Sequence, residues 1–159
     1  MQNADNYSVT TPNDLEILVT RSFSAPRELV FQAFTDPQYV PRWMLGPDGW
    51  TMPICEIDLR VGGAWHFVWR QQNGTEMEMR GIYREIDPPA RLVTTESWGG
   101  DWPETINTFT LAAHAGRTTL TQTMRYPSKQ ARDRALQTGI KEGMALSFAR
   151  LDRTLAASA

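Results

Sequence analysis

The sequence predicts an α+β fold in which an antiparallel sheet precedes one long C-terminal helix. From Met52 to Tyr126, apolar and polar residues alternate with the period of two that is typical of strands. Strong turn signals interrupt this alternation, among them Asn73-Gly74 and Asp87-Pro88-Pro89. Consecutive strands that are joined by short turns pair antiparallel. After Ser128, apolar residues recur at spacings of three or four, as on one face of a helix.

The length of 159 residues fits a single domain, because a chain of this size buries enough surface to stand alone. Residues 1–14 are polar and show little periodicity, so we expect a flexible N-terminal arm there. Residues 15–157 are then the folded domain.

The domain begins with one strand and two short helices. Leu15–Phe23 is rich in apolar and β-branched residues and predicts the first strand. Pro26 suits the first position of a helix, and Asp36-Pro37 ends that helix. A second short helix is predicted to reach Trp43.

Six further strands and a terminal helix complete the prediction. The strands are expected at residues 54–59, 65–70, 76–86, 91–98, 105–112 and 118–126. Ser128 is the predicted N-cap of a helix that continues to about Ala157. Gly139 and Gly143 lie within it and each lower helix stability by roughly 1 kcal/mol relative to Ala. Such glycines would allow close approach to the sheet or a kink over a cavity.

Charge and residue counts exclude several functional classes. The formal net charge of −2 leaves no basic excess, so nucleic acids and anionic membranes are not expected partners. Cys55 is the only cysteine and there are two histidines, which argues against a disulfide, a metal site or a Cys-His nucleophile. No cofactor is expected. The lack of a leader pattern and of a long apolar segment favours the cytoplasm.

The strand pattern gathers aromatic and methionine side chains on one face of the sheet. Trp65, Phe67 and Trp69 share that face, whereas His66 points to the other. The side chains expected to line a cavity are those of Trp43, Trp65, Phe67, Trp69, Met77, Met79, Tyr83, Trp98, Phe109, Leu120, Gln122, Met124, Met144 and Phe148. The same side chains fit a packed core equally well.

Short motifs spread along the chain resemble those of a known superfamily. They are Ser24-Ala25-Pro26-Arg27-Glu28-Leu29-Val30-Phe31 with Asp36-Pro37, Trp43, Gly46-Pro47, Asp58-Leu59-Arg60, Gly62-Gly63, Glu85-Ile86-Asp87-Pro88-Pro89, Arg91-Leu92 and Gly143-Met144. With them, the stretch from Leu15 to Leu155 resembles the START-like superfamily. Within it, the chain is similar to the group related to the C-terminal domain of the activator of heat-shock protein 90 ATPase.

This resemblance implies a helix-grip fold, in which a curved sheet wraps a long helix and leaves a cavity between them. Met44-Leu45 and Met144 stand where that group often has tryptophan. Methionine adapts its shape more readily than tryptophan, so the cavity is expected to be wider or more deformable than usual.

Three functions are consistent with the sequence, and binding of a hydrophobic or aromatic small molecule in the cavity is the first. The second is a polyketide cyclase- or hydratase-like enzyme, in which Tyr83, Glu85 or Glu96 moves a proton. Each of these three residues has an alternative structural role; Glu85, for instance, can pair with an arginine near the double-proline turn. Gln122 would only orient a substrate.

The third function is a co-chaperone-like interaction domain, which only the resemblance implies. A chaperone partner is not expected, because the partner domain that characteristically precedes this one is not in the chain. Trp50, Trp98 and Trp102 lie in or beside predicted loops and could frame the cavity mouth or make a homodimer contact.

Overall fold

The structure is a computed structural model of the chain and describes residues 6–158. Its strands are β1 (Tyr7–Thr10), β2 (Glu16–Phe23), β3 (Trp50–Ile57), β4 (Ala64–Gln71), β5 (Glu76–Asp87), β6 (Arg91–Glu96), β7 (Thr105–His114) and β8 (Arg117–Arg125). Its helices are α1 (Arg27–Thr35), α2 (Val40–Trp43), α3 (Lys129–Leu136) and α4 (Ile140–Ser158).

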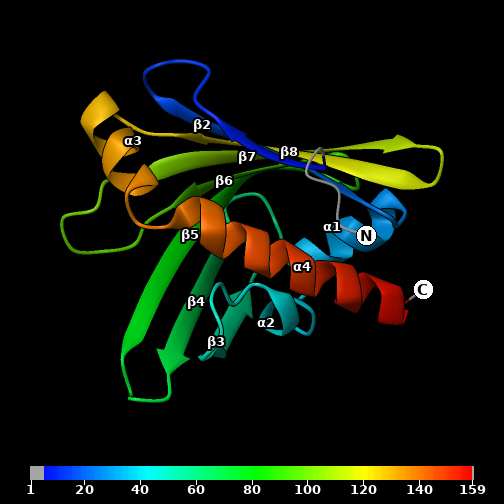
Figure 1. The fold of residues 1–159 in the computed structure, drawn as a ribbon, viewed down its shortest axis with the longest axis horizontal. Coiled ribbons are helices and arrows are strands. Elements are labelled where there is room, and N and C mark those ends of the chain that lie inside the picture. The colour runs from blue at the N-terminus through cyan, green and yellow to red at the C-terminus, as the bar shows by residue number, and fades with distance from the viewer. Residues whose placement is uncertain (1–5, 159) are drawn as a thin grey trace.

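The eight strands form one antiparallel sheet in the order β1-β2-β8-β7-β6-β5-β4-β3. The sheet is strongly curved, and α4 lies across its concave side (Figure 1). Helices α1 and α2 pack beside α4, and α3 precedes it near the far end of the sheet. The predicted helix-grip fold is confirmed.

The N-terminal segment requires a correction. Residues 7–10, expected in a flexible arm, form β1 and pair with β2 from Tyr7 opposite Arg21 to Thr10 opposite Leu18. The Tyr7 hydroxyl also donates a hydrogen bond of 2.7 Å to the carbonyl of Lys141 in α4. A strand of four residues is too short to show a clear period, which is why the sequence did not reveal it. Residues 1–5 of the expected arm lie outside the described residues.

The single C-terminal helix is also corrected, because it is two helices. Ser128 is the N-cap of α3 as predicted, and its hydroxyl accepts a hydrogen bond of 3.1 Å from the Ala131 N–H. Gly139 then adopts a φ of 82°, a left-handed conformation that glycine adopts at little cost. The chain turns at this residue before α4 begins. Gly139 thus lies in the break between α3, which ends at Leu136, and α4, which begins at Ile140, instead of kinking one longer helix.

The first strand after the short helices begins earlier than predicted. β3 starts at Trp50, and its pairing with β4 shifts register between Thr51 and Ile54. Pro53 lies within this shift and cannot donate to a ladder. β3 is at the edge of the sheet, where the missing donor costs little. The proline hid the first half of the strand from sequence reasoning.

Aromatic rings fill the space between the sheet and α4. The Phe148 ring packs against Tyr7, Phe23 and Trp43, with centroid distances of 5.9, 5.6 and 6.2 Å. The indole N–H of Trp43 donates to the carbonyl of Ala33 at 2.9 Å, so this buried polar group is satisfied. Trp43 and Phe148 therefore serve as core.

Candidate functional site

The concave face changes from apolar to polar along β6, β7 and β8. Pairing places Glu96 opposite Thr105, Asn107 opposite Met124, and Gln122 opposite Phe109. We call one group of side chains the polar end; it comprises Glu96, Thr105, Asn107, Gln122 and Tyr126. Leucine and phenylalanine side chains occupy the other end of the same strands.

Hydrogen bonds link three members of the polar end. The Gln122 amide donates to Asn107 Oδ1 at 3.4 Å, and the Asn107 amide donates to Thr105 Oγ1 at 3.2 Å. Asn107 is fully buried. A buried amide is costly unless it is hydrogen-bonded, so these contacts fix its orientation.

Glu96 is the titratable group of the polar end that changes charge near neutral pH. Burial raises its pKa from 4.5 to about 7, although the indole N–H of Trp98, which donates to Oε1 at 3.0 Å, lowers it. Burial and the Glu96 charge together raise the pKa of Tyr126 far above 10. A carboxyl with a pKa near 7 can both give and take a proton at neutral pH.

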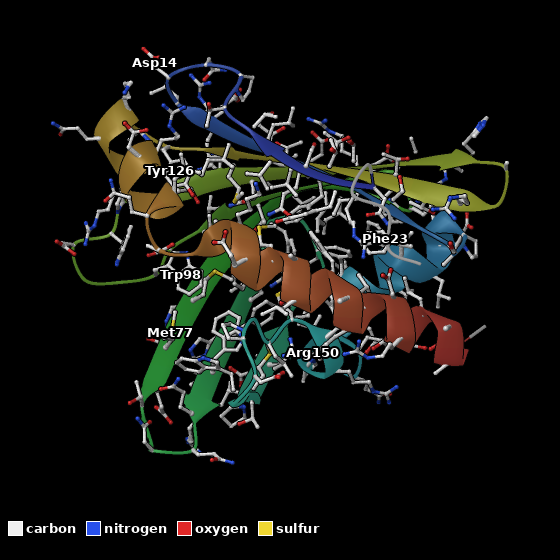
Figure 2. The ribbon with its side chains drawn as sticks, in the orientation of Figure 1. Asp14, Phe23, Met77, Trp98, Tyr126 and Arg150 are labelled. Carbon is white, nitrogen blue, oxygen red and sulfur yellow. The ribbon has the colours of Figure 1, made fainter. Side chains whose placement is uncertain are left out.

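Trp98 covers the polar end from the β6–β7 loop. Its ring stacks on Trp69 with a centroid distance of 5.6 Å and an interplanar angle of 17°. Trp69 is itself held by an indole hydrogen bond of 2.7 Å to the carbonyl of Met44. Trp98 is 36% exposed and Met77 is 43% exposed. Figure 2 shows Trp98 near the first turns of α4 and Met77 further along β5, toward its hairpin.

The same loop is fastened to α3. The Arg134 guanidinium lies 3.7 Å from the centroid of the Trp102 ring, and it forms an ion pair of 3.2 Å with Asp101. A cation stacked on an indole contributes about 0.5–1 kcal/mol at an exposed site. The β6–β7 loop is therefore held on one side by the stack of Trp98 on Trp69 and on the other by the contacts of Arg134.

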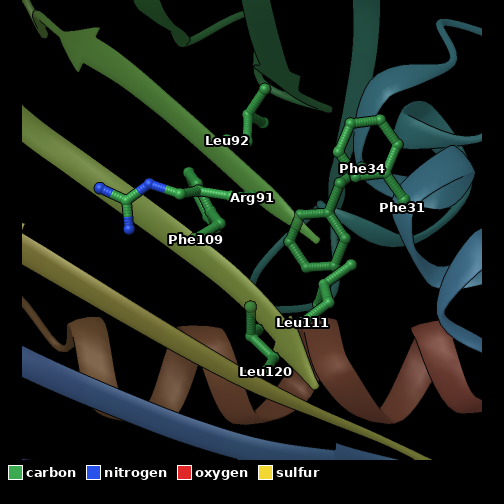
Figure 3. A pocket seen from close by; sticks show the side chains of 7 residues that line it. All are labelled: Phe31, Phe34, Arg91, Leu92, Phe109, Leu111 and Leu120. Atoms are coloured by element: carbon green, nitrogen blue, oxygen red, sulfur yellow. The ribbon is translucent and has the colours of Figure 1, made fainter. Parts of the chain in front are cut away.

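The two described hollows lie away from the polar end. A cavity of about 10 Å³ beside α1 is lined mostly by apolar side chains and has room for about one water molecule (Figure 3). Its lining residues are Phe31, Phe34, Arg91, Leu92, Phe109, Leu111 and Leu120. An open surface groove of about 540 Å³ runs along α1 beside Leu59 and Pro88.

Most of the side chains expected to line a cavity are packed inside the protein. The buried ones are Trp43, Trp65, Phe67, Trp69, Met79, Tyr83, Leu120, Gln122, Met124 and Phe148. Phe109 and Met144 are partly buried against the same core. Met77 and Trp98 are exposed. Whether these residues bind a ligand stays a prediction.

The three candidate proton-transfer residues have different surroundings. Glu85 is exposed and pairs with Arg91 at 2.5 Å, so its expected place inside the cavity was wrong and its structural alternative holds. The β5–β6 register shift between Tyr83 and Glu85 is what turns Glu85 outward. Tyr83 is buried, and burial raises its pKa far above 10. Glu96 alone combines an interior position with a pKa near neutrality.

Sequence reasoning missed Thr105, Asn107 and Tyr126. A signal was present, because Thr105 and Asn107 alternate in phase with apolar Leu111 on β7. Tyr126 follows Met124 in the same way. A polar residue at a core position of a strand indicates a hydrogen-bonding or functional role, because burying a polar group without a partner is costly.

Other chemistry receives no support from the described residues. His66 lies outside the cavity as expected, between Glu56 and Glu78 on the opposite face of the sheet. Burial raises the pKa of Cys55 to about 11, which keeps its thiol protonated. Within residues 6–158, no group of three or more His, Cys, Asp or Glu side chains could hold a metal ion. In the same range, no helix has the length and apolar character to cross a membrane.

Comparison with known proteins agrees with the fold and adds a family. Over 95% of this chain and 98% of the other, the structure is similar to that of a Rhodobacter sphaeroides protein, with 27% identity and a TM-score of 0.88. A Chromobacterium violaceum protein is 28% identical over 91% of this chain and 98% of its own, with a TM-score of 0.74. A Nitrosomonas europaea protein is 22% identical over 93% and 98% and has a TM-score of 0.83, which shows the fold alone.

No curated protein matches the chain. The family model described as "Activator of Hsp90 ATPase homolog 1-like protein" matches residues 24–156, which include the aromatic face, the polar end, α3 and nearly all of α4. The chain therefore belongs to the family of activator of Hsp90 ATPase homologue 1-like proteins.

Proposed function

We propose that the protein binds a small hydrophobic or aromatic molecule between the sheet and α4, with the polar group of the ligand at the polar end. The observation that carries this proposal is the change from apolar to polar side chains along one concave face. Ligand sites commonly combine an apolar wall with a few convergent polar groups. Burying Asn107 and Gln122 carries a desolvation cost that an all-apolar core would avoid.

Entry of a ligand requires side chains to move. Trp98, Met77 and Met144 are exposed or only partly buried. Trp98 donates to Glu96 of the polar end and stacks on Trp69, and Met77 pairs with Trp69 across the strands. Methionine has three rotatable bonds and fills or vacates space at low cost. A ligand would shift the methionine side chains and lie against Trp69.

The test is stoichiometric binding of a hydrophobic fluorescent dye, compared between two variants of α4. Met144→Trp fills the proposed site and should weaken binding by about tenfold or more. Leu146→Trp adds the same ring at a position that is 46% exposed and should leave affinity within about twofold. Equal affinity in the wild type and in both variants would place the dye elsewhere and overturn the proposal.

A cyclase- or hydratase-like activity is the second proposal, and the pKa of Glu96 favours it. A carboxylate of this pKa, held beside an apolar wall, can remove a proton from carbon next to a ketone. We expect the protein to accelerate exchange of the α-protons of phenylacetone with solvent deuterium, followed by NMR. Glu96→Gln should return the rate to that of buffer. Exchange that is equally fast in the variant would remove Glu96 from this role.

We do not expect a chaperone partner, although the family description names an activator of the Hsp90 ATPase. A pull-down with the chaperone and an assay of its ATPase rate decide this directly. Capture together with stimulation would favour the co-chaperone function instead. A cytoplasmic location and a homodimer that uses the exposed Trp98 are further expectations, which fractionation and light scattering would test.

A further inference from the structure

Glu96 is a half-buried carboxyl group whose pKa is raised by burial. None of the ion pairs within residues 6–158 includes it. Oε1 accepts the indole N–H of Trp98, whereas Oε2 accepts no hydrogen bond in the described part of the chain and is not sealed from solvent. One carboxyl oxygen is therefore open to an incoming group.

Arg21, a buried charge that pairs with α4, shows the contrast. Arg21 is 2% exposed and makes two hydrogen bonds to Asp152, at 2.6 and 3.1 Å. Ionised groups in protein interiors are normally paired in this way, because an unpaired buried charge is expensive. Half-buried Glu96 has no such partner among the described residues.

The charged side chains near Glu96 are paired with other groups or exposed to solvent. Arg80, whose backbone bridges Ser97, pairs with Glu78 on the opposite face of the sheet. Arg134 on α3 is engaged by Asp101 and Trp102. Lys141 and Glu142 on the first turn of α4 are exposed, as is Glu104 before β7.

Aromatic rings flank the unpaired carboxyl group. Trp98 donates to it and stacks on Trp69, and Tyr126 lies close enough for the Glu96 charge to raise its pKa. The face of an indole attracts a cation by about 0.5–2 kcal/mol, depending on desolvation. An anion beside stacked indoles is a suitable setting for an ammonium group, and an unsuitable one for a second carboxylate.

We propose that the ligand is a hydrophobic amine, whose protonated nitrogen pairs with Glu96 beneath Trp98 while its apolar body lies against Trp69 and the adjoining methionines. This inference rests on the proposed ligand-binding function and narrows it to one chemical class. The ammonium group supplies the missing counter-charge and donates to Oε2. An alcohol would donate a hydrogen bond to Glu96 but supply no counter-charge, and a carboxylate would be repelled.

The test compares three probes with the same apolar body, namely 4-phenylbutylamine, 4-phenylbutanol and 4-phenylbutyrate, by titration calorimetry at about pH 8. The amine should bind about tenfold more tightly than the alcohol, and the carboxylate most weakly. Glu96→Gln should reduce amine affinity to the level of the alcohol and leave alcohol affinity within about twofold. Glu104→Gln removes an exposed charge of the same sign nearby and should change neither affinity.

A second measurement uses the wild-type protein alone. At about pH 7, amine binding should release a fraction of a proton from Glu96 into the buffer, and alcohol binding should release none. Titrations in buffers of different ionisation enthalpy give this number. Equal affinities for amine and alcohol, or amine binding without proton release, would overturn the inference while the binding function stood. Failure of all three probes and of the hydrophobic dye would remove the binding function itself.

Discussion

Arg21 on β2 and Asp152 on α4 form a two-pronged ion pair that ties the sheet to the last helix. Their contacts measure 2.6 and 3.1 Å, and the Arg21 guanidinium also donates to the carbonyl of Ser22 at 2.6 Å. The guanidinium lies 4.9 Å from the centroid of the Phe23 ring and 6.0 Å from that of Phe148. The charge of Arg21 is thus buried between two rings and neutralised by one carboxylate.

Asp152→Ala should lower the free energy of unfolding by about 2–4 kcal/mol, because it leaves the buried Arg21 unpaired. The lower part of this range reflects the partial exposure of Asp152. Urea titration measures the change. The double variant Arg21→Met with Asp152→Leu should recover most of the loss. A change of under about 0.5 kcal/mol in Asp152→Ala would show that the pair contributes nothing to stability.

The stability of the wild type should fall as pH rises from about 4.5 to about 7, through the titration of Glu96. Burial raises the folded-state pKa above its ordinary value of 4.5, so within this window the folded chain keeps a proton that the unfolded chain has released. The effect should be on the order of 2 kcal/mol. Glu96→Gln should remove this part of the pH dependence. Urea midpoints measured at about pH 5 and pH 8 for both proteins isolate this effect. An equal change in midpoint between the two pH values in wild type and variant would contradict the assignment.

Gly81→Ala should destabilise the protein by about 2–3 kcal/mol or more, because the indole of Trp65 lies on this glycine. A Cβ atom there would lie 2.1 Å from the carbonyl oxygen of Thr95 and 2.3 Å from the Trp65 ring. That ring cannot yield freely, since its N–H donates to Thr94 at 2.6 Å. Thermal unfolding measures the loss.

Gly143→Ala is the matched control for Gly81→Ala. A Cβ atom at Gly143 would meet only Pro47, at 4.0 Å. Alanine also favours a helix over glycine, so this variant should stabilise α4 by about 0.5–1 kcal/mol. A loss of stability at Gly143 equal to that at Gly81 would show that the effect comes from glycine content and not from the Trp65 contact.

Arg134→Ala should free the β6–β7 loop from α3 and uncover the polar end. Without the stack on Trp102 and the pair with Asp101, Trp98 should be reached more easily by solutes. Acrylamide quenching of tryptophan fluorescence should increase, and the hydrophobic dye should bind faster. Arg153→Ala, at an exposed position on α4, should change neither. Unchanged quenching in Arg134→Ala would mean that the contacts of Arg134 with Trp102 and Asp101 do not hold the loop.

The sequence was enough to predict strands β2 to β8, the two short helices and the inward face of β4, because period two and strong turn signals are local properties. It could not predict β1, whose four residues acquire their structure by pairing with β2. Nor could it separate Gly139 from Gly143, since both are glycines near the same apolar stripe. Only the conformation of Gly139, with φ of 82°, distinguishes a helix end from a helix interior.

The candidate site was predicted in part. Glu96 was named, but its pKa depends on how three strands and a loop surround it, which no local pattern encodes. Glu85 was placed wrongly because a register shift in β5 changes which side chains face inward. The polar end emerged only when pairing brought Asn107 and Gln122 from different strands into one row of hydrogen bonds.

The position of β2 has a consequence for how the chain can be shortened. The family model begins to match at residue 24, yet β2 ends at Phe23 and lies between β1 and β8. A fragment cut at that boundary would leave the backbone N–H and C=O groups of β8 without partners along one side. An unpaired edge strand of this kind can pair with strands of neighbouring molecules and lead to aggregation. The strand directly before the matched stretch thus covers the side of β8 that such a fragment would expose.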